Sequence, residues 1–139
     1  MTMQTFSKWL YAGLAVLGGG QASAQSQTPA GILRKTLLEQ QLPATTVETV
    51  RMDGLTLGPG AGAPDHYHPC EVYGYVVEGQ ILYQVHGQEP VLLHAGDSFR
   101  EAAGERITVF KNALTDKPSK FIAIYLAKKG QSLIKFTDQ

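Results

Sequence analysis

The stretch GAGAPDHYHPCEVYGYVVEG, residues 60–79, decides the fold of this chain. A loop rich in glycine and proline leads into two histidines, and a run of apolar and aromatic residues follows before the closing glycine. Glycine and proline interrupt regular structure, whereas β-branched and aromatic residues favour strands. The stretch therefore predicts a loop that enters a strand, with His66 and His68 at the entrance.

His66 and His68 are two residues apart. Side chains at positions i and i+2 of an extended strand point to the same face, so both imidazoles can reach one metal ion. Histidine suits Zn, Fe, Ni, Cu and Mn, given one or two further ligands. A His-x-His pair on its own also fits two polar surface residues, but the loop before it and the glycine-terminated strand after it make the pair a more specific signal.

The rest of the chain predicts short strands separated by turns. Residues 80–86 (QILYQVH), for example, alternate apolar and polar side chains, which is the period of a half-buried strand. No segment after the N-terminal region shows a helical period, and turns at short intervals are typical of an all-β barrel or sandwich. The predicted strands cover residues 47–57, 71–77, 80–86, 91–94, 98–101, 107–112 and 120–127, with a candidate edge strand at 32–38.

The spacing of glycines and histidines in residues 60–79 matches the first motif of a known family. That motif is a glycine, five residues, His-x-His, and a glycine at the end of the following strand. The matching positions are Gly60, His66, His68 and Gly79. LHAGDSFREAAG, residues 93–104, with Asn112 after it, looks like the second motif. Over about residues 47–126 the chain resembles the small single-domain proteins of the cupin superfamily.

This resemblance implies both a fold and a place for a ligand. The implied fold is all-β, a single-domain cupin-type jelly-roll β-barrel with six or more antiparallel strands. A ligand pocket is implied at the wider mouth of the barrel, where this family often holds one divalent metal ion.

Two of the family's metal ligands are absent from their expected positions. Val72 stands where the family has a glutamate, and Ile107 stands where it has a further histidine. Glu71 is next to Val72, but strict alternation would turn it away from the histidines in an unbroken strand. A bend or bulge at residues 69–70 would restore it to the pocket. The predicted metal ligands are His66, His68 and Glu71.

Other residues could complete the site or line the pocket. Cys70 shares strand parity with the histidines and could supply a thiolate, although a small buried residue is the simpler interpretation. His86 and His94 precede turns and are expected at the rim of the barrel. Arg100 and Glu101 lie near the second motif and could line the mouth of the barrel, but a solvated pair is the simpler expectation. The residues expected to line a ligand pocket are Tyr83, Val72, Ile107 and Cys70.

These residues leave three functions open. The first, implied by the resemblance, is a metal-dependent enzyme of the dioxygenase, isomerase, lyase or decarboxylase type, with one divalent ion (Fe, Mn, Ni, Zn or Cu) as Lewis acid. The alternative is a non-catalytic small-molecule-binding barrel without tightly bound metal. The third is an assembly role as a homodimer through exposed strand edges. A Glu71 that points inward would favour the enzyme, and Val72 in its place would favour the binding barrel.

Length and charge exclude some classes of protein. The chain has 139 residues, which is room for one domain. Its 12 Lys and Arg balance 12 Asp and Glu, so the formal net charge is zero at pH 7. A nucleic-acid binder usually carries a basic excess, so nucleic acid is not expected as a partner. The single cysteine excludes an internal disulfide and a zinc site built from several thiolates.

The N-terminus has the three-part pattern of a secretory signal peptide. Lys8 precedes a short apolar run at residues 9–17, and the small residues Ala22-Ser-Ala24 follow. The run is too short to span a bilayer of about 30 Å, although an uncleaved anchor or a buried helix is the alternative. We predict Sec-type cleavage after Ala24, a periplasmic or secreted protein, and no stable membrane span after cleavage. The predicted parts are a signal peptide (1–24), a disordered leader (25–31) and the barrel domain (32–139).

Overall fold

The structure is a computed structural model that describes residues 30–137. The predicted signal peptide and most of the predicted leader lie outside these residues. The chain divides after Arg34, and every strand belongs to the unit that begins at Lys35. Between residues 30 and 137 there is no helix long and apolar enough to cross a membrane.

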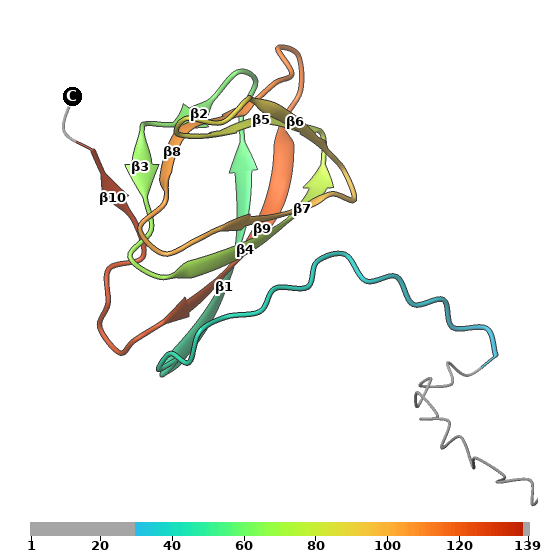
Figure 1. The fold of residues 1–139 in the computed structure, drawn as a ribbon. Helices are drawn as coiled ribbons and strands as arrows, with labels where there is room; N and C mark the ends of the chain where they lie inside the picture. The colour runs from blue at the N-terminus through green and yellow to red at the C-terminus, as the bar shows by residue number, and fades with distance from the viewer. Residues whose placement is uncertain (1–29, 138–139) are drawn as a thin grey trace, which may run out of the picture. The chain divides into compact units, whose positions relative to one another are not determined.

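The fold is all-β, as predicted. The strands are β1 (Thr49–Leu57), β2 (Gly62–Ala63), β3 (His66–Tyr67), β4 (Glu71–Glu78), β5 (Gln80–Val85), β6 (Val91–His94), β7 (Ser98–Glu101), β8 (Arg106–Asn112), β9 (Ser119–Ala127) and β10 (Lys135–Phe136). One antiparallel sheet has the order β1-β9-β4-β7, and the other has the order β10-β3-β8-β5-β6, with β2 beside β8. The two sheets face each other around a shared apolar interior (Figure 1). This arrangement confirms the predicted jelly-roll barrel.

Most of the predicted strands are confirmed. Those predicted between residues 47 and 127 correspond to β1 and to β4 through β9, with ends that differ by no more than two residues. The predicted edge strand at 32–38 is wrong, because this exposed segment pairs with no neighbouring strand. It contacts the barrel instead through the carbonyl of Leu37, which accepts a hydrogen bond from the Ser98 hydroxyl at 2.8 Å. The two-residue strands β2, β3 and β10 are too short to carry a periodic pattern.

Three phenylalanines fill the middle of the barrel. Phe110 on β8 lies 5.0 Å from Phe121 on β9 and 5.5 Å from Phe99 on β7, measured between ring centroids. Gly74 on β4 makes room for Phe99, since a Cβ at that position would lie 2.0 Å from its ring. Aromatic rings bury large apolar areas, so this cluster joins the two sheets and forms one wall of the cavity described below.

A polar group is buried as deeply as these rings. Asn112 at the end of β8 and Ser119 at the start of β9 are 1% and 0% exposed. The Asn112 oxygen accepts hydrogen bonds from the Ser119 hydroxyl at 2.7 Å and from the Leu114 N–H at 2.9 Å. Its amide nitrogen donates to the carbonyls of Leu57 (3.2 Å), Gly58 (3.0 Å) and Lys117 (2.8 Å). We call this group the Asn112–Ser119 network; it ties two loops to the end of the barrel.

Candidate metal centre

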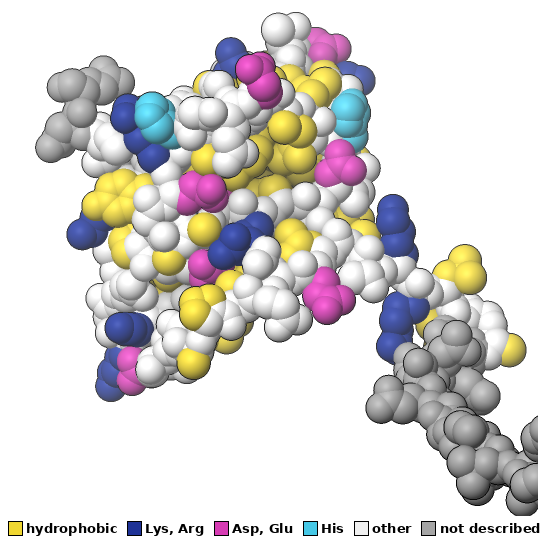
Figure 2. Space-filling model, in the orientation of Figure 1, with side chains coloured by type: hydrophobic (Ala, Val, Ile, Leu, Met, Phe, Trp, Pro, Cys, Tyr) yellow, Lys and Arg dark blue, Asp and Glu magenta, His cyan; other side chains and the backbone are white. Residues whose placement is uncertain are grey.

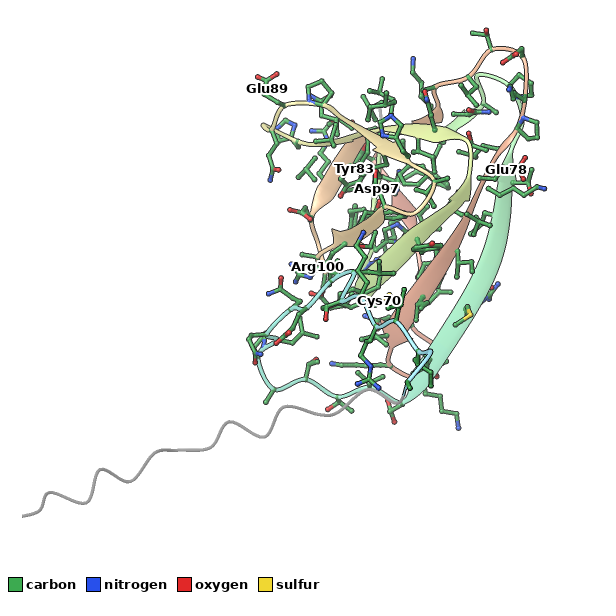
Figure 3. The ribbon with its side chains drawn as sticks, turned by 90° about the vertical axis from the view of Figure 1, so that its right-hand side faces the viewer. Cys70, Glu78, Tyr83, Glu89, Asp97 and Arg100 are labelled. Atoms are coloured by element: carbon green, nitrogen blue, oxygen red, sulfur yellow. The ribbon has the colours of Figure 1, made fainter. Side chains whose placement is uncertain are left out.

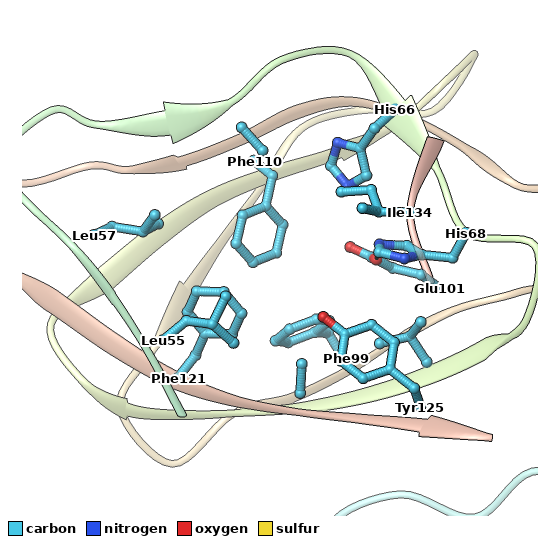
Figure 4. Close-up of a pocket in the computed structure, with 13 residues that line it drawn as sticks. Leu55, Leu57, His66, His68, Phe99, Glu101, Phe110, Phe121, Tyr125 and Ile134 are labelled. Carbon is cyan, nitrogen blue, oxygen red and sulfur yellow. The ribbon is translucent and has the colours of Figure 1, made fainter. Parts of the chain in front are cut away.

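Three buried polar side chains meet inside the barrel. His66 lies on β3, His68 lies just beyond its end, and Glu101 ends β7; they are 3%, 4% and 2% exposed. One donor atom from each residue lies within 4.8 Å of the other two. Figure 4 shows the three side chains together at one end of a pocket. We call them the His66–His68–Glu101 cluster.

Glu101 reaches the cluster because of the pairing between β4 and β7. Val72 on β4 and Glu101 on β7 are direct partners in the antiparallel register. Directly opposite residues point to the same face of a sheet, with Cβ atoms about 4.5–5.5 Å apart. Position 72 holds a valine and no carboxylate. Glu101 on the neighbouring strand β7 therefore supplies a carboxylate at the same place in the barrel.

Backbone carbonyls orient both imidazoles. Nδ1 of His66 donates to the carbonyl of Pro64 at 2.7 Å, and Nδ1 of His68 donates to the carbonyl of Leu133. A carbonyl oxygen only accepts, so Nδ1 carries the hydrogen, and the Nε2 of a neutral ring keeps the lone pair that a metal needs. Both rings are thus held ready to bind a metal through Nε2.

Glu101 also contacts His68 directly. Nε2 of His68 lies 2.8 Å from Oε2 of Glu101. Burial by itself lowers the pKa of His68, but the hydrogen bond and charge of Glu101, together with the Leu133 carbonyl, outweigh it, so the pKa of His68 is raised. The metal-free ring therefore favours a second proton, on Nε2, which a bound cation would replace.

The other carboxylate oxygen of Glu101 has no partner. Among residues 30–137, Oε1 of Glu101 is the buried side-chain atom left without a hydrogen bond. Such burial is unfavourable unless a cation or a donor compensates it. Two imidazoles and one carboxylate are a donor set that Fe(II) and Zn accept with further positions open. Ligands bound at about 2.0–2.2 Å to one ion lie no more than about 4.4 Å apart, so small side-chain rotations fit this cluster to a divalent metal.

The cluster faces a cavity of about 110 Å³ between the two sheets. Apart from the cluster, the wall is apolar or aromatic and includes Val72. Figure 4 labels the other larger wall residues: Leu55, Leu57, Phe99, Phe110, Phe121, Tyr125 and Ile134. An apolar wall limits the access of water and strengthens electrostatic interactions beside the cluster. The cavity is therefore suited to hold a small molecule next to a metal.

Glu71 lies outside the cluster. Its carboxylate accepts hydrogen bonds from Nε and Nη2 of Arg100 at 2.8 and 2.9 Å. The pairing of β4 with β9 is regular from Glu71 to Val76, and the bend at residues 69–70 does not turn this side chain inward. Strand alternation places Val72 on the inner face instead. We therefore replace Glu71 by Glu101 in the metal set.

The four residues expected to line the pocket lie in different places. Val72 lines the cavity. Ile107 is fully buried in the core, and the Tyr83 hydroxyl donates to a backbone carbonyl at 3.1 Å; neither lines the cavity. Cys70 is buried in the wall of a separate cavity, and desolvation raises the pKa of its thiol. Figure 3 shows Cys70, Tyr83 and Arg100 on the ribbon.

The residue that sequence reasoning missed is Glu101. The expected solvated pair with Arg100 is wrong, because Arg100 points to the other face of β7. Phe99 and Glu101 both face inward on this strand, so the apolar side chain two residues before Glu101 is the signal that could have placed it. His86 and His94 are exposed, as expected for the rim, and take no part in the cluster.

Solved structures share this fold at low identity. Oxalate oxidase in complex with the substrate analogue glycolate has a TM-score of 0.55 and 21% identity, over 63% of this chain and 46% of that chain. A DMSP lyase from Ruegeria pomeroyi has a TM-score of 0.55 and 18% identity, over 65% and 44%. A cupin-like protein from Thermotoga maritima has a TM-score of 0.56 and 20% identity, over 63% and 64%. The chain thus spans less than half the length of the first two, and the likeness is one of fold.

No curated protein matches the sequence. The family model described as the cupin domain, in contrast, matches residues 55–125. This range contains both histidines, Glu101 and the strands that position them. Because the match covers just over half of the chain and the two-sheet barrel agrees with it, the chain belongs to the cupin family.

Proposed function

We propose that this cupin binds one divalent metal ion through His66, His68 and Glu101 and catalyses a reaction of a small molecule there. The observation that carries the proposal is the unpartnered Oε1 of Glu101, buried beside two imidazoles whose Nδ1 atoms are already bonded. Buried polar atoms in a purely structural role normally have partners. The unpartnered carboxylate oxygen therefore supports a site for a cation.

Each part of the site has a role in such chemistry. The ion would supply Lewis acidity and open coordination positions for a substrate. The carbonyls of Pro64 and Leu133 hold the two imidazoles in one orientation, and Glu101 contributes one negative charge to the ligand set. The phenylalanine rings make the wall apolar, which would limit the access of water and strengthen the electrostatic interactions of the polar groups.

The metal and the reaction type are proposed only as classes. Fe, Mn, Ni, Zn and Cu all accept imidazole ligands, and a carboxylate suits most of them. The proteins of similar fold include an oxalate oxidase, a DMSP lyase and a sugar phosphate isomerase. Oxidative, lyase and isomerase chemistry are therefore supported equally at this level of likeness.

Metal analysis tests the proposal. The protein, purified without a polyhistidine tag and incubated with each of these metals in turn, is expected to retain a single ion. Glu101→Gln removes the charged ligand and is expected to lose the ion. Glu71→Gln is the matched control and is expected to keep it, because Glu71 pairs with Arg100 outside the cluster. Failure of every metal to bind, or equal loss in both variants, would overturn the proposal.

A non-catalytic role is the second candidate. Val72 and Ile107 put aliphatic side chains where the family resemblance implies two further ligands. The cavity would then bind a small molecule without tightly bound metal. Thermal-shift screening of the metal-free protein against small acids, sugars and aromatic compounds tests this role. Stabilisation that Glu101→Gln leaves unchanged would favour binding over catalysis.

We also propose that the protein is exported, on the pattern of residues 1–24. Mass spectrometry of the periplasmic or secreted protein is expected to find Gln25 at the N-terminus. Cleavage after Ala24 removes Trp9, the single tryptophan of the chain. Tryptophan emission from the exported protein would therefore contradict cleavage at this position.

A homodimer is proposed through β1, which is an edge strand of its sheet. Val50 and Met52 on this strand are 65% and 64% exposed. An exposed edge with apolar side chains favours pairing with a second copy. Light scattering is expected to show a dimer that Met52→Lys weakens, and a monomer at high protein concentration would contradict it.

A further inference from the structure

The cavity beside the cluster has a polar end and an apolar body. In the described part of the chain, no Lys, Arg, Asn, Gln, Ser or Thr side chain lines it. The larger wall residues are Leu55, Leu57, Phe99, Phe110, Phe121 and Ile134. A ligand whose body carried several polar groups would lose their hydration there without gaining hydrogen bonds. The wall therefore selects a ligand with an apolar body.

Tyr125 on β9 contributes one polar group to the apolar part of the cavity. Its ring centroid lies 5.8 Å from that of His68, and Figure 4 shows its hydroxyl pointing into the cavity. No hydrogen bond joins this hydroxyl to another described residue, whereas the hydroxyl of Tyr83 donates to the carbonyl of Arg100 at 3.1 Å. The Tyr125 hydroxyl is not among the fully buried atoms without a partner, so it is accessible and can donate to a ligand in the cavity.

The Tyr125 hydroxyl is a donor at ordinary pH. The ordinary pKa of a tyrosine hydroxyl is about 10, so this group carries its hydrogen at neutral pH. A protonated hydroxyl donates its hydrogen to an oxygen of the ligand. The geometry thus presents a hydrogen-bond donor on the same side of the ligand as His68.

The volume of the cavity limits the size of the ligand. The cavity measures about 110 Å³. A cavity of about 150 Å³ lined by apolar side chains holds benzene in another protein. A ring or short chain of no more than about six non-hydrogen atoms therefore matches the volume inside the barrel.

Charge sets the kind of head group. A divalent ion together with the Glu101 carboxylate carries one net positive charge. The described wall offers no cationic side chain to neutralise more than one negative charge on a ligand. A neutral or singly charged oxygen head therefore matches the site, whereas a dianion would leave a buried charge uncompensated.

We infer that the cavity binds a small, mainly apolar molecule with one oxygen-bearing head group, and that the Tyr125 hydroxyl donates a hydrogen bond to that oxygen. The inference deepens the proposed function, because it names the substrate class of the same cavity. Tyr125 is then a specificity-determining residue. It favours phenol-like or short monocarboxylic compounds over polyanions and sugars.

Isothermal titration with phenol, benzene and oxalate tests the inference, on metal-free protein and on protein incubated with Zn²⁺. The wild type is expected to bind phenol more tightly than benzene and to bind oxalate more weakly than phenol. Tyr125→Phe is expected to weaken phenol binding about 2- to 13-fold, the value of one hydrogen bond, and to leave benzene binding unchanged. Tyr83→Phe is the matched control and is expected to leave both affinities unchanged.

Equal phenol affinity in the wild type and Tyr125→Phe would overturn the inference, as would tighter binding of oxalate than of phenol. The comparison of phenol with benzene on the wild type needs no variant, so it stands even if a variant fails to fold. Zinc binding without a preference for phenol over benzene would contradict this inference and leave the metal proposal intact. A Tyr125-dependent preference in a protein that binds no metal would support it while the metal proposal fails.

Discussion

The Asn112–Ser119 network and the His66–His68–Glu101 cluster are both buried in this barrel, and they differ in how completely their polar atoms are bonded. Asn112 and Ser119 satisfy one another and the surrounding backbone. The cluster leaves Oε1 of Glu101 without a partner, next to a cavity. Buried polar groups that stabilise the fold form hydrogen bonds with one another and with the backbone. A buried group that binds a ligand has an atom without a protein partner that faces the ligand.

Asn112→Ala is expected to have the largest effect on stability. It removes the amide that three backbone carbonyls and the Ser119 hydroxyl depend on, so the free energy of unfolding should fall by about 3 kcal/mol. Urea denaturation measures this loss. Metal affinity of the folded variant should be unchanged. A parallel loss of metal binding would show that the network and the cluster do not act independently.

Truncation after Ser132 tests how metal binding by the cluster depends on residues near the C-terminus, far from the histidines in sequence. It removes Leu133, whose carbonyl orients His68, and Ile134, which lines the cavity. We expect the metal affinity, measured by competition with a chelator, to fall about 10- to 100-fold. Truncation after Phe136 keeps these contacts and should keep most of the affinity. An equal loss in both truncated proteins would mean that the Leu133 carbonyl has no special role.

Glu101→Gln is expected to affect stability far less than Asn112→Ala. Glutamine keeps the volume and a hydrogen bond to His68 while it removes the unpartnered charge. The free energy of unfolding of the metal-free protein should therefore change by less than about 1 kcal/mol. The same urea experiment measures it. A loss as large as that of Asn112→Ala would identify the cluster as a structural network.

The smallest effect is expected at the surface of the site, where Asp65 precedes the histidines. Hydrogen bonds from Arg106 hold the pKa of Asp65 at about 2. Because this lies below the unfolded value of about 3.9, the pair's contribution is complete above that value and is lost as pH falls through about 2. Urea midpoints between about pH 5 and 2 should fall more steeply for the wild type than for Asp65→Asn. Equal slopes would show that the Asp65–Arg106 pair makes no contribution to stability in this pH range.

The visible face of the barrel carries charges of both signs. Figure 2 shows basic and acidic side chains scattered around a group of hydrophobic side chains. The presence of both signs agrees with the balanced charge of the sequence.

The strands and turns along the chain, together with the resemblance of its two motifs to a known family, were enough to predict the barrel, and strand alternation placed His66 and His68 on one face. Alternation is a local property of a strand, so it can be read from neighbouring residues. The same rule placed Glu71 and Val72 on opposite faces, yet it could not tell whether the chain would bend between the histidines and β4. The chain does bend at Pro69 and Cys70, where it passes from β3 in one sheet to β4 in the other, yet Glu71 still faces outward and pairs with Arg100.

The sequence by itself determined the all-β fold, its main strands and two of the three cluster residues, because each follows from patterns a few residues long. Only the tertiary structure decided the third residue and the orientation of His68. Glu101 depends on its register opposite Val72, and the Leu133 carbonyl comes from 65 residues beyond His68. Pairing between strands is set by the packing of the whole core, and no single stretch of sequence contains it.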